Sequence, residues 1–124
     1  MGRILVVDDE ADVVRTVTKA LEHRGHQVTS AVDGAEAIAR VQAEPPDCLV
    51  IDLALPKIDG QEVCRRLKAD PVTRHVPIVL MTAGYIAIEA AEDAGIRGAD
   101  EFVIKPFLRE ALVRQVERLL ARRP

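Results

Sequence analysis

Four short apolar runs divide this chain, and each of them stops at a polar residue. Runs of this length that are apolar throughout are typical of strands that a parallel sheet buries on both faces. The runs and the residues that end them are RILVV before Asp8, CLVI before Asp52, IVLM before Thr82 and FVI before Lys105. A chain with this pattern is expected to build a sheet in which four strands end in a polar, potentially functional group.

Segments with apolar residues at helical spacing alternate with these strands, and HQVTSAV (26–32) adds a fifth strand. A first helix begins at a cap on Asp9 or Glu10 and ends near Gly25. The other expected helices are 33–44 (with Ala35, Ile38, Ala39 and Val41), 60–68 (Val63 and Leu67 inward), 85–94, and 107–123 (Leu108, Leu112, Val116 and Leu119 on one face). Five strands alternating with five helices predict an α/β fold, with helices on both faces of a parallel sheet.

Length and composition indicate one globular domain over residues 1–124, since 48% of the 124 residues are hydrophobic. No apolar run approaches the ~20 residues of a membrane span, and the acidic start does not suit a signal peptide, so we expect a cytoplasmic protein. Cys48 and Cys64 lack metal or disulfide spacing and are expected to be reduced core thiols. His23, His26 and His75 are expected to face solvent rather than bind metal.

The net charge of −3 argues against nucleic-acid binding by the domain as a whole. The segment from Arg109 to Arg123 departs from that balance, because it carries five arginines against Glu110 and Glu117. One interpretation is a partner or nucleic-acid face. The other is a solvated helix face whose late arginines complement the helix dipole.

Polar groups from four strands are expected to meet at one edge of the sheet, because parallel strands share their carboxyl ends. They are Asp8 and Asp9, Asp52, Thr82 and Lys105. Adjacent carboxylates repel one another unless a cation intervenes, and oxygen ligands without His or Cys favour Mg²⁺. Asp52 could then act as a nucleophile toward a phosphoryl group, with Thr82 and Lys105 stabilising its oxygens.

These residues resemble the receiver domains of two-component response regulators over essentially the whole chain. ILVVDDEAD is similar to the acidic pair of that family, CLVIDLALPKIDG to its phosphoacceptor strand and loop, PIVLMTA to its switch-hydroxyl strand and GADEFVIKPF to its lysine strand. The resemblance implies a flavodoxin-like (βα)5 fold with strand order 2-1-3-4-5. It also implies a single receiver domain over 1–124, either excised from a longer protein or acting alone.

The resemblance assigns roles to individual positions. Asp52 is the implied phosphoacceptor, and Asp8 and Asp9, with Asp52 and the backbone carbonyl of Ala54, are the implied Mg²⁺ ligands. Asp9 would ligate directly and Asp8 partly through water. Lys105 would bind the phosphoryl group, Thr82 and Phe102 would be the switch residues, and the Lys105–Pro106 bond would be cis.

The implied function is signalling rather than ordinary catalysis. A partner histidine kinase or histidine phosphotransfer protein would phosphorylate Asp52, and the face made by the fourth helix, fifth strand and fifth helix would switch, together with the Ala-rich segment 84–97. A downstream target or output domain would read the switch, and the resemblance allows a phosphorylation-dependent homodimer. The small residues Ala54 and Gly84 could not orient an attacking water, so dephosphorylation is expected to be slow.

Two other functions fit part of this pattern. An aspartate-nucleophile phosphatase also uses an acidic motif after its first strand, but it usually needs Asp-x-Asp where this chain has Asp8, Asp9 and Glu10. A phosphorylation-independent, receiver-like interaction module would not need the complete set of site residues. The complete set favours the phosphoacceptor.

Overall fold

The structure, a computed structural model, describes residues 2–83 and 99–122. Nine elements occur in these ranges: β1 (Arg3–Val7), α1 (Ala11–His23), β2 (Gln27–Ala31), α2 (Gly34–Ala43), β3 (Cys48–Asp52), α3 (Gly60–Ala69), β4 (Ile78–Thr82), β5 (Glu101–Ile104) and α5 (Arg109–Ala121). The helix expected over 85–94 lies outside the described residues. The other predicted elements are found within a few residues of their expected bounds.

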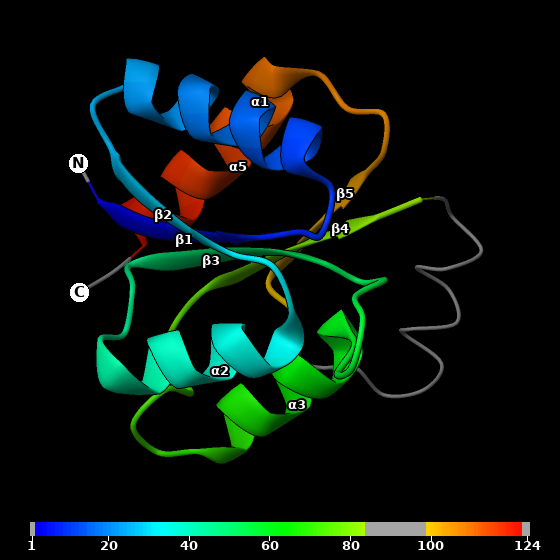
Figure 1. The fold of residues 1–124 in the computed structure, drawn as a ribbon. Coiled ribbons are helices and arrows are strands. Elements are labelled where there is room, and N and C mark those ends of the chain that lie inside the picture. The colour runs from blue at the N-terminus through cyan, green and yellow to red at the C-terminus, as the bar shows by residue number, and fades with distance from the viewer. Residues whose placement is uncertain (1, 84–98, 123–124) are drawn as a thin grey trace.

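The five strands form one parallel sheet of order β2-β1-β3-β4-β5, which confirms the predicted topology. Helices α1 and α5 cover one face of the sheet and α2 and α3 cover the other (Figure 1). The register pairs Val7 with Ile51, Asp52 with Met81, and Thr82 with Ile104. The strands therefore end nearly level, and the residues at or just after their ends share one edge of the sheet.

Two apolar layers hold the helices on the sheet. Under α1 and α5 lie Ile4, Val6, Val50, Val79 and Met81, packed against Val17, Leu21, Leu112 and Val116. Under α2 and α3 lie Leu5, Val7, Leu49, Ile51 and Leu80, packed against Ala37, Val41, Val63 and Leu67. Alternate residues of each central strand thus feed opposite layers, which explains why these strands are apolar throughout.

Several local predictions differ from the structure. Of the apolar residues expected on α2, Val41 is buried and Ala35 and Ala39 are exposed, and the buried face of the helix also contains Gly34 and Ala37. Leu108 is 72% exposed, since it is the residue before the first turn of α5 and precedes the helical face that contains Leu112.

The amino end of the sheet corrects another prediction. His26 is 7% exposed and not solvent-facing, because its ring lies between the backbone of Gly2 and the side chain of Glu117. His23 and His75 are exposed, as expected. Cys48 and Cys64 are buried free thiols, and burial raises the pKa of Cys64 to about 12, so this thiol is chemically inert.

Candidate functional site at the carboxyl edge of the sheet

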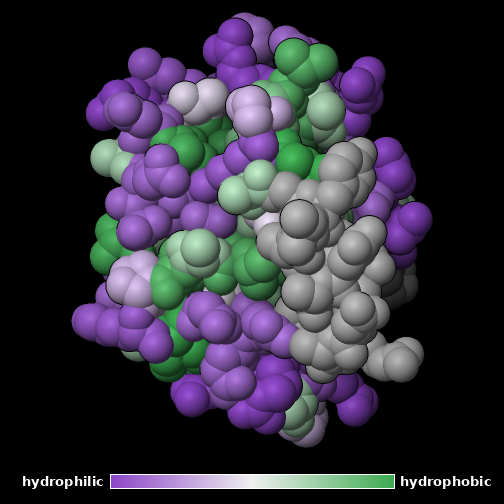
Figure 2. Space-filling view, turned by 90° about the vertical axis from the view of Figure 1, so that its right-hand side faces the viewer, coloured by the Kyte–Doolittle hydropathy of each residue, from purple (hydrophilic) through white to green (hydrophobic). Residues whose placement is uncertain are grey.

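Asp52 is the last residue of β3, the central strand of the sheet. The strand is buried along its whole length and holds Asp52 at the carboxyl edge with only 5% of its surface exposed. Its Oδ1 accepts a 3.4 Å hydrogen bond from the backbone N–H of Ala54, in the loop that follows. A buried strand and a local backbone contact therefore fix the Asp52 carboxylate. Figure 2 shows the molecule from the side on which the carboxyl edge of the sheet lies.

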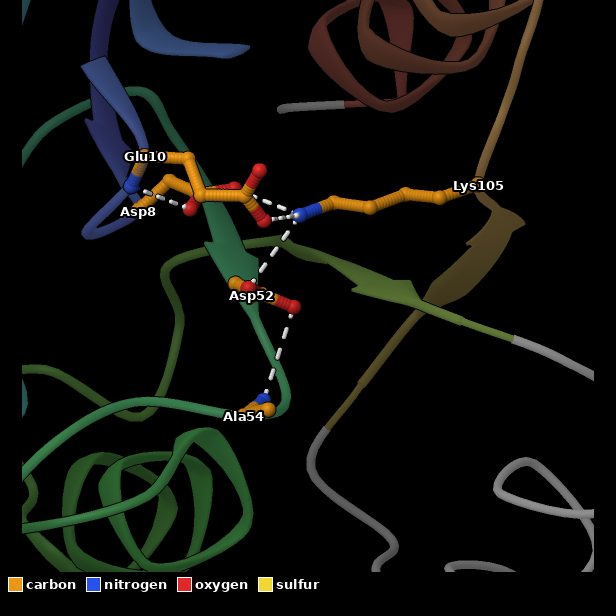
Figure 3. Close-up of polar contacts among 5 residues, drawn as sticks. All are labelled: Asp8, Glu10, Asp52, Ala54 and Lys105. Atoms are coloured by element: carbon orange, nitrogen blue, oxygen red, sulfur yellow. Dashed lines mark hydrogen bonds and ion pairs between the residues drawn. The ribbon is translucent and has the colours of Figure 1, made fainter. Parts of the chain in front are cut away.

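Lys105 follows β5 and extends its ammonium group across the edge to the carboxylates (Figure 3). Its Nζ donates to Asp8 Oδ2 at 2.8 Å and to Asp52 Oδ2 at 3.2 Å. The Lys105–Pro106 peptide bond is cis, as the family resemblance implied. One cation thus joins the ends of β1, β3 and β5.

Glu10 is a third acidic residue of the site. Its Oε1 lies 3.6 Å from Lys105 Nζ, and its backbone N–H donates to Asp8 Oδ1 at 2.9 Å. Asp8, Glu10 and Asp52 each offer an oxygen within 4.8 Å of the others, an arrangement that could hold a metal ion. Hard oxygen donors of this kind suit Mg²⁺.

Burial and neighbouring charges shift the pKa values of both Asp52 and Lys105. Burial raises the pKa of Asp52, and the nearby Asp8 raises it further, while Lys105 only partly opposes the shift. Burial disfavours the charge of Lys105, but its hydrogen bonds to Asp8 and Asp52 outweigh that effect and raise its pKa. The edge therefore holds more negative charge than its single ammonium group neutralises.

Asp8, Glu10 and Asp52 are called the carboxylate cluster below. Thr82 ends β4, the strand next to β3, and is 1% exposed. Its Oγ1 is buried and has no hydrogen-bond partner among the described residues. A buried hydroxyl without a partner costs about 1–3 kcal/mol, so its retention at the site calls for a reason. An oxygen-rich ligand bound at the edge would supply the missing partner.

Three other predicted site residues lie outside the carboxylate cluster. Asp9 is exposed, while Asp8 and Glu10 on either side of it belong to the cluster. Ala54 is exposed in the loop after β3, where its N–H faces Asp52. Phe102 on β5 is half-buried and packs against the apolar layer that contains Leu80. Gly84 lies outside the described residues.

The sequence analysis missed Glu10 and Gly60. In the sequence Glu10 stands out only as a possible helix cap, whereas in the structure it makes no side-chain cap and its N–H binds Asp8 two residues earlier. Gly60 begins α3, and a Cβ there would overlap the carbonyl oxygen of Asp52 and crowd Leu53. The position of Gly60 at the end of the loop between β3 and α3 could have indicated it, because glycine allows two backbone segments to approach closely.

Fold and site together define a doubly wound α/β protein with an acidic, lysine-bridged edge. Comparison with known proteins gives the family: residues 4–117 match the response regulator receiver domain, and the chain belongs to this family. It is a two-component receiver domain with the flavodoxin-like fold, and such a domain is a phosphoacceptor rather than a conventional enzyme.

Curated relatives agree with this assignment. The chain is 38% identical over 122 residues to the transcriptional regulatory protein PrrA of Mycobacterium tuberculosis, which covers 98% of this chain and 51% of PrrA. It is 39% identical over 121 residues to the response regulator MprA of Mycobacterium avium, which covers 97% of this chain and 51% of MprA. The chain therefore spans about half the length of these relatives.

Solved structures share the fold. A putative response regulator from Chloroflexus aurantiacus has a TM-score of 0.89 and 36% identity, and 98% of each chain is covered. The chemotaxis response regulator CheY4 of Vibrio cholerae has a TM-score of 0.87 and 28% identity, with 96% of this chain and 98% of CheY4 covered. Among the described residues, no helix combines the length and the apolar character that crossing a membrane would require.

Proposed function

We propose that Asp52 accepts a phosphoryl group from the phosphohistidine of a partner histidine kinase or histidine phosphotransfer protein. Receiver domains pair with histidine kinases, and a receiver domain of a histidine kinase from Syntrophus aciditrophicus is structurally similar, with a TM-score of 0.89 and 31% identity. The observation that carries the proposal is the juxtaposition of Asp52 with the Lys105 ammonium at 3.2 Å and with the buried Thr82 hydroxyl, which has no partner among residues 2–83 and 99–122.

In the transfer step, an Oδ atom of Asp52 attacks phosphorus while the bond from phosphorus to the histidine nitrogen breaks. The imidazole leaves with the bonding electron pair and is neutral after transfer. Lys105 neutralises charge on the phosphoryl oxygens, and the Thr82 hydroxyl donates to one of them. Hydrolysis later cleaves the acyl phosphate, which returns the carboxylate and releases inorganic phosphate.

The carboxylates of Asp8, Glu10 and Asp52 fit a divalent cation, because three hard oxygen donors converge where one ammonium group now lies. Mg²⁺ is the proposed ion, with Asp9 and the Ala54 carbonyl completing its ligands as the family resemblance implies. When bound, Mg²⁺ would supply neutralising charge to the phosphoryl oxygens. Without any bound cation, mutual repulsion of the carboxylates would oppose approach of a phosphoryl group.

The proposed output is a switch. The new phosphate would draw Thr82 and Lys105 toward it, and Phe102 would fill the space that Thr82 leaves. The face made by β5, α5 and the segment 84–97, which lies outside the described residues, would then act on a downstream target, an output domain or a second copy of the chain. The length of the curated relatives supports an output domain in the whole protein.

Domain organisation, location and lifetime of the phosphorylated state belong to the same proposal. Residues 1–124 would form one receiver domain acting in the cytoplasm, and this domain would not itself bind nucleic acid. The phosphorylated state would be long-lived, because Ala54 is a small side chain beside Asp52 and Gly84 is the second position expected to control hydrolysis.

Two separate assays test the function. In one the chain is incubated with Mg²⁺ and acetyl phosphate, and in the other with Mg²⁺ and p-nitrophenyl phosphate. In the first assay we expect at most one covalently bound phosphate per chain, stable in acid and labile in base. The Asp52→Asn variant should carry no bound phosphate. Steady release of p-nitrophenol would favour an aspartate-nucleophile phosphatase. Absence of any label on the wild-type chain would favour a phosphorylation-independent module.

A further inference from the structure

A groove of about 570 Å³ lies between α1 and α5, the two helices that cover one face of the sheet (Figure 1). From α1 it is lined by Lys19 and Ala20, and from α5 by Arg109, Val113 and Arg114. None of these residues belongs to the carboxylate cluster at Asp52. The arginine-rich segment noted in the sequence therefore forms one wall of a groove rather than only a solvated face.

The groove is cationic even though the chain is acidic. Lys19, Arg109 and Arg114 are exposed, and none of them makes an ion pair or side-chain hydrogen bond within residues 2–83 and 99–122. Glu110 is the other charged residue of α5 at this wall that has no ion pair in the same ranges. Three unpaired cations thus face one unpaired carboxylate.

Glu117, the second acidic residue of the groove, is already neutralised. Its two carboxylate oxygens accept from Arg24 at 3.2 and 3.1 Å, and Oε2 also lies 3.1 Å from His26 Nε2. The Gly2 N–H donates to His26 Nδ1 at 3.1 Å, which leaves Nε2 to donate its proton to Glu117. Since Arg24 and His26 hold Glu117, it does not compensate Lys19, Arg109 or Arg114.

The lining also contains apolar surface. Ala20 and Val113 line the groove together with the charged residues; Ala20 is half-buried and Val113 is 7% exposed. Cations beside a small apolar strip complement a segment that carries both carboxylates and aliphatic side chains. A nucleic acid would match the cations but not this apolar surface.

We propose that the α1–α5 groove docks an acidic, amphipathic segment of a protein partner, with Lys19, Arg109 and Arg114 facing its carboxylates. This docking does not require phosphorylation of Asp52, because no hydrogen bond or ion pair between described side chains joins the groove residues to that site. Its failure and a failure of the proposed phosphoacceptor function can therefore be observed separately.

The experiment measures fluorescence anisotropy of a fluorescein-labelled helical peptide built from Glu and Leu, titrated with the unphosphorylated chain at low salt. We expect Lys19→Gln combined with Arg114→Gln to weaken binding about tenfold, since each exposed charge pair contributes modestly. The matched control is Arg74→Gln combined with Arg122→Gln, which removes two exposed cations outside the groove and should leave binding within twofold.

Binding should also weaken as salt is added, because exposed charges are screened. The proposal is overturned if the peptide does not bind the wild-type chain, or if the groove and control variants weaken binding equally. It is also overturned if a labelled DNA duplex binds the wild-type chain but not the groove variant, while the peptide binds neither. Circular dichroism of each variant checks that the fold is retained.

Discussion

The two ends of the β-sheet use buried polar groups in opposite ways. At the amino end, the Gly2 N–H donates to His26, and Glu117 contacts both His26 and Arg24. At the same end, the buried Thr73 hydroxyl donates to the Leu67 carbonyl at 2.7 Å. Every one of these groups has a partner from the chain itself.

At the carboxyl end, the polar groups are left incomplete. Asp8, Glu10 and Asp52 share one ammonium group, burial and Asp8 raise the pKa of Asp52, and the Thr82 hydroxyl has no partner within the described ranges. The other buried side-chain oxygen without a described partner is Gln115 Oε1 on α5. The difference indicates that the amino end stabilises the fold and the carboxyl end is arranged for a ligand.

Removing Lys105 at the carboxyl end and Arg24 at the amino end should give the largest difference in the free energy of unfolding. Lys105→Met would leave Asp8 and Asp52 buried together without a positive charge, and we expect the free energy of unfolding to fall by about 3 kcal/mol at neutral pH. Arg24→Met would leave Glu117 paired with His26, so its effect should be much smaller. Urea unfolding of both variants measures the difference, and equal losses would contradict the contrast.

Adding a methyl group at each end should give the next effect. Gly60→Ala would push a Cβ into the backbone of Asp52, and we expect a loss of about 2 kcal/mol together with a slower phosphorylation of Asp52. Gly2→Ala is the control, because the nearest atoms to its Cβ would be the flexible end of Leu120 at 3.0 Å, with Asp47 Cβ at an ordinary contact distance of 3.5 Å. Thermal unfolding compares the two, and a Gly60→Ala variant as stable as Gly2→Ala would show that the backbone contact is not tight.

Neutralising one acid at each end should change stability with opposite sign. The folded chain holds a proton on Asp52 more tightly than the unfolded chain, so ionisation of Asp52 costs stability as pH rises from ~3.9 through its raised folded pKa. Asp52→Asn should therefore stabilise the fold at neutral pH and lose that advantage in acid.

The matching variant at the amino end is Glu117→Gln. Hydrogen bonds from Arg24 lower the pKa of Glu117, so its contribution to stability is present above the unfolded pKa and is lost as pH falls through the folded one. Glu117→Gln should therefore destabilise the fold at neutral pH and cost little in acid. Urea midpoints measured from pH 3 to 8 decide both signs, and a destabilising Asp52→Asn at neutral pH would contradict this reading.

The smallest contrast concerns two buried threonines. Thr82→Val removes a hydroxyl that has no described partner and should leave stability unchanged or raise it by up to about 1 kcal/mol. Thr73→Val removes a hydroxyl that donates to Leu67 and should lower stability by about 1 kcal/mol. Differential scanning calorimetry distinguishes them. Equal losses would mean that Thr82 has a partner in the folded chain.

The carboxyl end could be predicted largely from the sequence. Strands buried on both faces show as continuous apolar runs, and level strand ends bring Asp8, Asp52, Thr82 and Lys105 to one edge by topology alone. Glu10 escaped prediction because its position depends on the hydrogen bond from its own N–H to Asp8. Such a local turn has no clear signature in sequence.

The amino end could not be predicted in the same way. His26 is buried by contacts with Gly2 and Glu117, which are 24 and 91 positions away along the chain. Helical spacing placed Leu112 correctly and failed for Leu108, because a residue before the first helical turn need not share the face of that helix. Contacts between distant segments and details of helix ends are therefore where the structure adds most.

The central claim is that Asp52 alone accepts the phosphoryl group. Treating the chain with acetyl phosphate and Mg²⁺, followed by borohydride, reduces an aspartyl phosphate to homoserine, which tandem mass spectrometry locates in the sequence. We predict homoserine at position 52 and at no other aspartate, with none formed in Asp52→Asn. Homoserine at position 8 or 9 in the wild-type chain, or its complete absence, would contradict the account.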